Sequence, residues 1–173
     1  MIDGMATQKI RFVELPPAAM TALLAGDLAT GRALTGVELG QLFVEDRAQW
    51  LWGYRLKQLE STPEDAAWIA RVVIGEDAVV GYAGFHGGPD EVGMVEVGYT
   101  VDPAYQRRGY ATAILGALLE RARGEDEVKV VRASISPDNV ASLATVAKYG
   151  FVQVGDQWDD EDGLELLFEL PVK

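Results

Sequence analysis

The sequence of 173 residues has no cysteine and only one histidine, His86. Without cysteine the chain cannot form disulfide frameworks, zinc or iron–sulfur sites with cysteine ligands, or a cysteine nucleophile. A single histidine also excludes metal sites built on several imidazoles. We therefore expect an activity that uses neither a metal nor a covalent thiol intermediate.

Basic side chains are also scarce, since there are 15 lysines and arginines against 27 acidic residues and the net charge is −12. Nucleic-acid binders bring lysine and arginine to the phosphates, so this charge argues against such a partner and favours a cationic one. Long apolar runs are missing too: no stretch approaches a membrane span, and Met1–Met5 shows no basic and apolar leader pattern. We expect a cytoplasmic protein without a membrane partner, and homodimer formation stays open.

The remaining composition is that of a globular protein, with 49% hydrophobic and 24% charged residues. No repeat, low-complexity tract or linker divides the sequence, so we expect residues 1–173 to form one domain. The strands predicted from apolar patterns are Ile10–Leu15, Trp68–Ile74, Ala78–Phe85, Met94–Val101, Lys129–Ile135, Phe151–Val154 and Leu164–Leu170. The helices predicted from a 3.6-residue period are Ala18–Leu24, Arg47–Leu59, Gly109–Arg123 and Asn139–Tyr149.

The order of these elements determines the expected fold class. Consecutive strands favour antiparallel pairs, whereas a strand, a helix and a strand in succession favour a parallel crossover. We therefore expect an α/β protein with α+β character. Its central sheet should be mixed, mostly antiparallel, of about six to seven strands, and flanked by helices.

The sharpest local motif is Gln106-Arg107-Arg108-Gly109-Tyr110-Ala111, between a predicted strand and a predicted helix. The first amides of a helix have no partner within it and lie at the positive end of the helix dipole, so such a turn can bind a diphosphate. Gly109 allows phosphates to approach the backbone, and the arginines add positive charge. An ordinary helix start with solvated arginines is the alternative. The motif is neither a Walker loop nor a dinucleotide fingerprint.

Together with two further segments, this motif resembles the GNAT superfamily of acyl-CoA-dependent N-acetyltransferases. The family's pyrophosphate loop, Gln/Arg-x-x-Gly-x-Gly/Ala, is similar to residues 106–111. Asn139–Phe151 is similar to the family's Asn-x-x-Ser/Ala helix that ends in Gly-Phe. Val95–Pro103 is similar to the strand before the loop in the branch that acetylates N-termini of ribosomal proteins.

The resemblance implies a GNAT-like fold and transfer of an acetyl group from acetyl-CoA to a primary amine by direct attack, without a metal. The acceptor would be a protein N-terminus or a small cationic amine. Backbone N–H groups at Tyr99–Val101 would polarise the thioester carbonyl, and the Asn139 amide would hold the pantetheine arm. The cofactor-binding residues that it implies are Thr100, Val101, Gln106, Arg107, Arg108, Gly109, Tyr110, Ala111, Thr112, Asn139, Ser142 and Lys148.

Glu96 and His86 are the candidate catalytic bases. An ammonium acceptor must lose its proton before attack, and a carboxylate acting directly or through water can take it. Glu96 alternates with Val95 and Val97, so it lies on the opposite strand face from them, next to the implied carbonyl site. His86 follows the preceding strand and is the competing base, since imidazole exchanges protons near neutral pH. An exposed strand glutamate and a structural histidine are the alternatives.

One position departs from the family's pattern. Many members have a tyrosine seven residues after the helix asparagine, which protonates the CoA thiolate, and Val146 occupies that place. Tyr149 lies on a different helix face, so water or Tyr99 would deliver the proton, or the thiolate would leave unassisted. The alternative function is therefore a weak or silent acyl-CoA-binding sensor or interaction domain. An unrelated α/β hydrolase or phosphate-binding protein is less favoured, because the Gly-x-Ser-x-Gly elbow is missing.

Two further features each allow two interpretations. Within the helix predicted at Arg47–Leu59, Trp50 and Tyr54 form an aromatic stripe. The favoured interpretation is that the stripe packs in the core, and the second interpretation is that it lines an acceptor pocket. Acidic residues crowd a turn predicted between the last two strands, where solvation comes first and steering of a cation second, since this hairpin lines the acceptor entrance in the family. These acids are Asp156, Asp159, Asp160, Glu161, Asp162 and Glu165.

Overall fold

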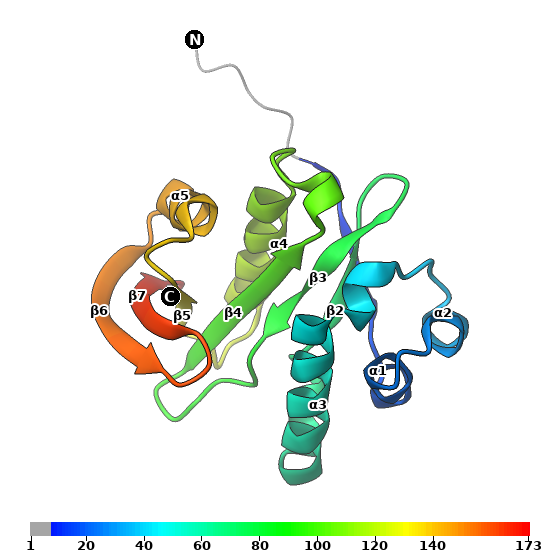
Figure 1. Cartoon of the computed structure of the whole chain (residues 1–173). Coiled ribbons are helices and arrows are strands. Elements are labelled where there is room, and N and C mark those ends of the chain that lie inside the picture. Colours follow the sequence, from blue (N-terminus) through cyan, green and yellow to red (C-terminus); the bar gives the residue numbers. More distant parts are fainter. Residues whose placement is uncertain (1–7) are drawn as a thin grey trace.

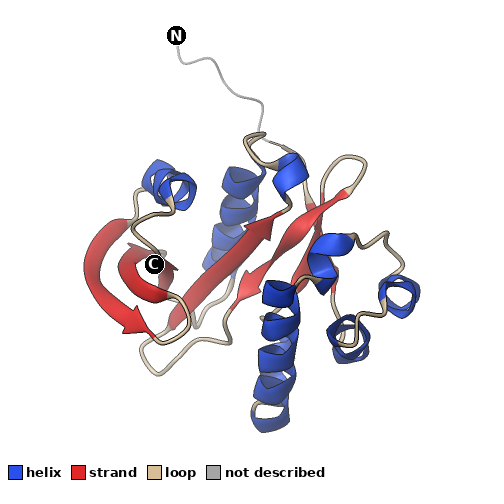
Figure 2. Cartoon of the chain, viewed as in Figure 1, coloured by secondary structure: helices blue, strands red, loops and turns tan. Residues whose placement is uncertain are grey.

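The apolar segments form one seven-stranded sheet in the computed structural model, which describes residues 8–173 (Figures 1 and 2). Met1–Met5, the segment without a leader pattern, lies outside the described residues. In the order β1-β2-β3-β4-β5-β7-β6, only β4 and β5 are parallel neighbours within this sheet, which confirms the mixed, mostly antiparallel prediction. The strands are β1 (Arg11–Glu14), β2 (Arg71–Ile74), β3 (Val79–Phe85), β4 (Met94–Val101), β5 (Val130–Ile135), β6 (Val152–Asp159) and β7 (Gly163–Pro171).

Helices cover both faces of the sheet (Figure 2). In Figure 1, α3 lies in front of the sheet with α1 and α2 to its right, whereas α4 lies behind β4. The helices are α1 (Pro17–Leu24), α2 (Leu28–Thr35), α3 (Asp46–Ser61), α4 (Tyr110–Gly124) and α5 (Val140–Lys148), with short 3₁₀ helices η1 (Gln41–Val44), η2 (Pro63–Ala67) and η3 (Pro103–Tyr105). Among residues 8–173, no helix is both long and apolar enough to cross a membrane.

Each face of the sheet has its own hydrophobic core. Neighbouring residues of β2 show the division, since Val72 packs with α1 and α3 and Val73 packs with α4. On the first face Trp52 stacks on Phe43 with ring centroids 6.1 Å apart, and its indole N–H donates to the carbonyl oxygen of Phe43 at 2.8 Å. Because alternate side chains point to opposite faces, the two cores hold β2 and β3 from both sides.

The structure corrects three predicted elements. Helix α2 was not predicted: it is short, and Asp27 caps it by accepting a hydrogen bond from the Thr30 amide. The strand predicted from Trp68 begins only at β2, because Ala70 has a φ of 36°. The acidic turn is mostly strand, since pairing between β6 and β7 continues to Asp159 and Gly163 and leaves only residues 160–162 as the turn.

Leu119 of α4 tests the core behind the sheet, because its side chain is fully buried. Leu119→Ala should lower the free energy of unfolding by about 2–5 kcal/mol, since it removes buried methyl groups and leaves a cavity. Leu34→Ala on α2, where the leucine is 47% exposed, is the control and should cost well under ~1 kcal/mol. Urea unfolding measures both, and equal effects would contradict the core assignment of Leu119.

Candidate active site

The pairing between the parallel strands β4 and β5 ends early. The ladder joins Met94–Glu96 to Val130–Arg132, whereas β4 continues to Val101 and β5 to Ile135. Beyond Glu96 the two strands therefore diverge. Backbone groups that a continuous ladder would pair are left facing the gap.

The direction of these backbone groups follows from the pairing of β4 with β3. The amide of His86 donates to the carbonyl oxygen of Glu96 at 2.8 Å, and the amide of Asp102 donates to that of Val80 at 2.8 Å, so even-numbered residues of β4 bond toward β3. Alternation then turns the N–H groups of Tyr99 and Val101 toward β5, into the gap. The Thr100 amide points the other way, so only its side chain is presented to the site.

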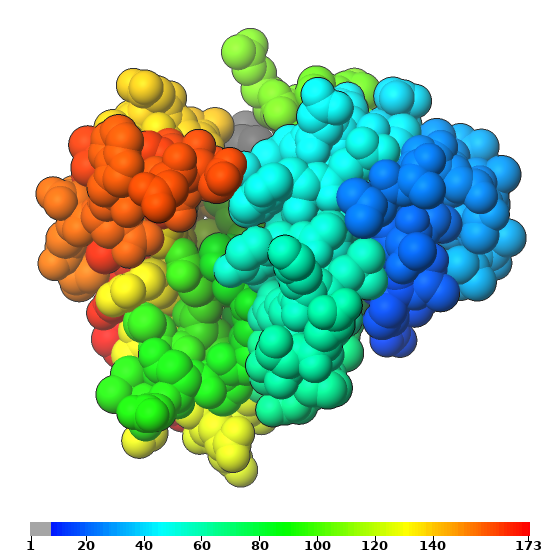
Figure 3. Space-filling model, turned by 60° about the horizontal axis from the view of Figure 1, so that its bottom comes forward, coloured from blue at the N-terminus to red at the C-terminus, as the bar shows by residue number. Residues whose placement is uncertain are grey.

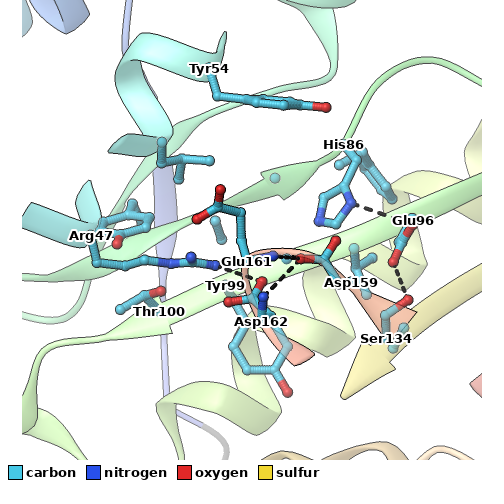
Figure 4. A pocket seen from close by; sticks show the side chains of 18 of the residues that line it. Arg47, Tyr54, His86, Glu96, Tyr99, Thr100, Ser134, Asp159, Glu161 and Asp162 are labelled. Atoms are coloured by element: carbon cyan, nitrogen blue, oxygen red, sulfur yellow. Dashed lines mark hydrogen bonds and ion pairs between the residues drawn. The ribbon is translucent and has the colours of Figure 1, made fainter. Parts of the chain in front are cut away.

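Glu96 and His86 meet at the edge of this gap (Figure 4). Nδ1 of His86 lies 3.4 Å from Oε2 of Glu96, and the hydroxyl of Ser134 on β5 donates to Oε1. The imidazole lies over Gly98, where a Cβ atom would be 2.8 Å from Nε2 of the ring. Nε2 has no hydrogen-bond partner among residues 8–173. The two residues that the sequence presents as competing bases are thus in contact.

The surroundings of Glu96 favour its ionised form. Burial raises its pKa, but the imidazole of His86, the hydroxyl of Ser134 and the guanidinium of Arg132 together outweigh burial, so the pKa of Glu96 is lowered. Arg132 is itself held by Glu169 of β7, with Nε 3.1 Å from Oε1. Glu96 is therefore a carboxylate whose two oxygens are both engaged by neighbours.

A cavity of about 730 Å³ lies over the gap. Figure 3 shows this face hollowed between the β6–β7 hairpin, in orange, and α3, in teal. Trp50 and Tyr54 of α3 line the cavity, are 40% and 55% exposed, and stack with ring centroids 5.4 Å apart. Core packing is therefore wrong for this stripe, because Ala48 and Trp52 occupy the buried face of α3.

The β6–β7 hairpin forms an acidic wall of the cavity. Arg47 of α3 donates to Oδ2 of Asp162 at 3.0 Å and ties the hairpin to the helix. Within residues 8–173 the carboxylate of Glu161 forms no ion pair, and it extends toward Tyr54 in Figure 4. The charged residues of the lining are the acids Glu96, Asp159, Glu161, Asp162 and Glu165 and the bases Arg47 and Arg55. Carboxylates thus outnumber guanidinium groups around the cavity.

The loop before α4 has the backbone that its motif predicts. Arg107 and Gly109 have φ angles of 61° and 86°, in the left-handed region, and the helix begins at the next residue. The amide of Ala113 makes the first helical bond, to the carbonyl oxygen of Gly109 at 3.1 Å. Within the described part of the chain, the amides of residues 110–112 donate to no protein group. Such unpaired amides form an anion-binding concavity.

Some side chains of this loop attach it to the rest of the protein, and others face solvent. Gln106 donates to the carbonyl oxygen of Val101 at 3.1 Å and ties the loop to β4. Arg107 and Arg108 are exposed beside the free amides. Tyr110 is 8% exposed and packs in the core, so only its backbone is available to a cofactor, whereas the implied role included the whole residue.

Helix α5 brings the second motif to the same region. Oδ1 of Asn139 caps the helix by accepting from the amide of Ser142 at 3.1 Å, and the side-chain nitrogen Nδ2 of Asn139 has no protein partner in residues 8–173. Both side chains line the cavity. At the other end of the helix, Nζ of Lys148 lies 3.2 Å from Oγ1 of Thr112, at the start of α4. Tyr149 donates to the Thr112 carbonyl oxygen at 2.6 Å and so holds the two helices together.

Tyr99 is the tyrosine that reaches the gap. Its hydroxyl is buried and, among residues 8–173, makes no hydrogen bond of normal geometry. Burial raises its pKa, against the smaller opposing effects of the nearby hydroxyls of Ser142 and Thr145. Val146 is 1% exposed and packs in the core. The space toward α5 therefore holds the Tyr99 hydroxyl rather than one from residue 146.

Several residues of the site are missing from the sequence prediction. Ser134 had a usable signal, because it and Arg132 are polar residues at every second position between the buried Val131, Ala133 and Ile135. For Arg47 the sequence contains no such signal, because its partner Asp162 lies 115 residues away.

Comparisons with known proteins agree with this geometry. Residues 21–152 match the family model of the acetyltransferase (GNAT) domain. The chain is 35% identical over 74 residues to the uncharacterized N-acetyltransferase YjdG of Bacillus subtilis, which covers 43% of this chain and 44% of that protein. It is 41% identical over 81 residues to the N-alpha-acetyltransferase RimI of Mycobacterium tuberculosis, covering 44% and 48%. The matches span about half the length of these relatives.

A solved structure extends the similarity to almost the whole fold. RimJ of Mycobacterium smegmatis, in complex with CoA-disulfide, has a TM-score of 0.65 at 19% identity and covers 94% of this chain and 81% of that chain. At this identity the similarity is one of fold.

The lowered pKa of Glu96 predicts a pH dependence of stability. A carboxyl group whose pKa is lower in the folded than in the unfolded chain stabilises the fold fully above the ordinary glutamate pKa of about 4.3, and this contribution is lost as the pH falls through the lowered pKa. The free energy of unfolding of the wild type, minus that of Glu96→Gln, should therefore decrease between pH 7 and pH 3. Urea titrations at each pH measure it, and a constant difference would contradict the lowered pKa.

Proposed function

This chain belongs to the acetyltransferase (GNAT) family, and from that premise we propose that it transfers an acetyl group from acetyl-CoA to the primary amine of a cationic acceptor, within a single domain. The observation that carries the proposal is the His86–Glu96 pair at the edge of the gap between β4 and β5, inside a cavity with an acidic wall. The pair can take a proton from an amine, and the gap presents backbone donors beside it.

The described residues fit a CoA thioester. The free amides at the start of α4, with Arg107 and Arg108 beside them, suit the pyrophosphate. Nδ2 of Asn139 and the hydroxyl of Ser142 suit the pantetheine arm. When bound, acetyl-CoA supplies the acetyl group as an activated thioester. The N–H groups of Tyr99 and Val101, fixed in direction by β4, would stabilise negative charge on its carbonyl oxygen.

Within the pair, we assign the proton-accepting atom to Nε2 of His86. Both oxygens of Glu96 are already engaged, by His86 and Ser134, and its lowered pKa makes it a weak base. Nε2 has no protein partner among residues 8–173, and the His86 side chain is 44% exposed at the cavity. Glu96 then orients the imidazole and stabilises it once protonated, as carboxylates do for catalytic histidines.

Tyr99 is our candidate for the proton donor to the departing thiolate. Burial raises its pKa, which keeps the hydroxyl protonated at neutral pH, and this hydroxyl has no normal hydrogen bond among residues 8–173. These two properties support Tyr99 as the donor of the proton to the thiolate, which Val146 cannot be because it has no hydroxyl.

The lining charge supports a cationic acceptor. An ammonium group near His86 would share the cavity with the carboxylate of Glu161, which forms no ion pair within residues 8–173. It would also share it with the Trp50 and Tyr54 rings, whose attraction for cations is seen in their contacts with Arg47 and Arg55. A protein N-terminus and a small polyamine both have this charge.

Removal of either member of the pair tests the reaction. His86→Gln should lower kcat about a hundredfold or more because the base is lost. Glu96→Gln should do the same because the imidazole loses the carboxylate that orients it and stabilises its protonated form, while the affinity for CoA stays unchanged in both variants. Thiol release from acetyl-CoA with a panel of amines measures kcat, and Glu60→Gln, an exposed α3 residue outside the cavity lining, is the control.

Two outcomes would change the proposal. Full activity of His86→Gln would leave Glu96 as the sole base. If the wild type binds CoA but releases no thiol with any amine, the domain is a silent acyl-CoA-binding module.

Gly109 tests the pyrophosphate site. Gly109→Val should weaken CoA binding at least about tenfold, because its φ of 86° strains any residue with a Cβ and shifts the free amides. Gly36→Val at the end of α2 is a matched control, since Gly36 has a φ of 72° and open space around it. Calorimetry with CoA measures both. Equal affinities in the two variants would place the phosphates elsewhere.

A further inference from the structure

Two side chains of α3, Arg55 and Gln58, donate hydrogen bonds to one backbone atom, the carbonyl oxygen of His86. The distances are 3.2 Å from Nη1 of Arg55 and 2.7 Å from Nε2 of Gln58. Nη1 of Arg55 also donates to Oε1 of Gln58 at 2.7 Å, so the two donors hold each other in place. The residue after β3 is thus held from a helix on the face of the sheet.

The hydrogen bonds continue around the turn that follows His86. Nε2 of Gln58 donates to Oδ2 of Asp65 at 2.7 Å, and Oδ1 of Asp65 accepts from the amide of Gly88 at 2.9 Å. The turn fits closely, since a Cβ atom on Gly87 would lie 3.1 Å from Oδ2 of Asp65. Residues 86–88 are therefore held from α3 and η2 together.

The sheet holds His86 from the other side. Its amide donates to the carbonyl oxygen of Glu96 at 2.8 Å, so both its N–H and its C=O are engaged. A backbone held at both groups limits the rotamers of its side chain. The imidazole then lies over Gly98 with Nδ1 toward Glu96.

Arg55 is an unusual residue for packing alone. It is 8% exposed, forms no ion pair within residues 8–173, and has a pKa lowered by burial. Burying a guanidinium without a carboxylate partner is costly, and an apolar side chain would fill the space at less cost. The charge strengthens hydrogen bonds to Gln58 and to the His86 carbonyl oxygen, and the guanidinium also lies over the Tyr54 ring, 5.4 Å from its centroid.

We propose that Arg55 and Gln58 are positioning residues: by holding the carbonyl oxygen of His86, they fix its imidazole with Nδ1 toward Glu96 and Nε2 over Gly98, in the lining of the cavity. Their effect on catalysis rests on the proposed function, because it acts through His86. Their effect on the position of the ring does not.

Nuclear magnetic resonance tests the position of the ring without any substrate. His86 is the only histidine, so its ring protons are assigned directly. The wild type should show nuclear Overhauser contacts between these protons and the Hα atoms of Gly98, and Gln58→Leu should lose them. Lys57→Ala, an exposed neighbour on α3, is the control and should keep them. Contacts retained in Gln58→Leu would overturn the proposal.

Arg55→Lys provides a second variant if Gln58→Leu does not fold. Lysine keeps the charge but lacks the planar fork that reaches Gln58 and the carbonyl oxygen together, so the ring contacts should weaken while the urea midpoint changes little. Full retention of the contacts in a folded Arg55→Lys would also overturn the proposal.

A double-mutant cycle then separates positioning from direct contact with the acceptor. Gln58→Leu should lower kcat about tenfold or more with the KM for acetyl-CoA unchanged, and it should have no further effect in a His86→Gln background. An equal loss in both backgrounds would show that Gln58 acts independently of His86 and would contradict the proposal. Absence of activity in the wild type would reject the proposed function, while the ring contacts would still decide the positioning role.

Discussion

The early end of the ladder between β4 and β5 is the constraint on which the site depends. Three residue pairs, the last being Glu96 with Arg132, hold the strands parallel, and beyond them the strands separate. Separation turns backbone donors at Tyr99 and Val101 toward open space and leaves room for a cavity of about 730 Å³. A continuous ladder would satisfy those donors and close the space, because paired strands lie only about 4.8 Å apart. The rest of the fold keeps this opening in place: the core beneath α4 holds β4 through Val95, Val97 and Val101, and β7 pairs along β5.

The acid–base pair is assembled by elements from both sides of the opening. Glu96 belongs to β4, Ser134 to β5, and His86 to the end of β3, where α3 holds its carbonyl oxygen. The two carboxylate oxygens of Glu96 contact His86 and Ser134, and the backbone N–H and C=O of His86 are both hydrogen-bonded. Nε2 of the imidazole has no protein partner among residues 8–173. The acidic hairpin and the stacked rings of α3 then form the outer cavity, joined by Arg47 and Asp162. In this arrangement five carboxylates gather around the cavity, whereas Arg107 and Arg108 lie in the loop before α4.

Local features of the site could be predicted from the sequence with some success. The segment Gln106–Ala111 indicated a turn with unpaired amides at the start of a helix, because this feature depends only on neighbouring residues between a strand and a helix. Trp50 and Tyr54 were assigned first to the core, since an aromatic stripe on a helix has the same pattern whether it faces a core or a cavity. The acidic hairpin was predicted as a turn because its charged residues lack the apolar pattern from which strands are predicted. The edge strand β6 nevertheless forms there, because its backbone pairs with β7 and this pairing does not depend on apolar side chains.

By itself, the sequence determined the periodicity of the elements, the loop chemistry before α4 and the excess of acid. It also determined that a histidine follows one strand and that a glutamate lies early in the next. Only the tertiary structure decided that the side chains of His86 and Glu96 touch and that Ser134 donates a hydrogen bond to the second carboxylate oxygen of Glu96. It also decided that α3 holds the backbone of His86. The physical reason is the separation in sequence of the residues that interact. Periodicity and capping arise from residues within a few positions of each other, whereas these contacts join residues 10 to 38 positions apart and depend on strand register and helix packing, which many local patterns allow equally.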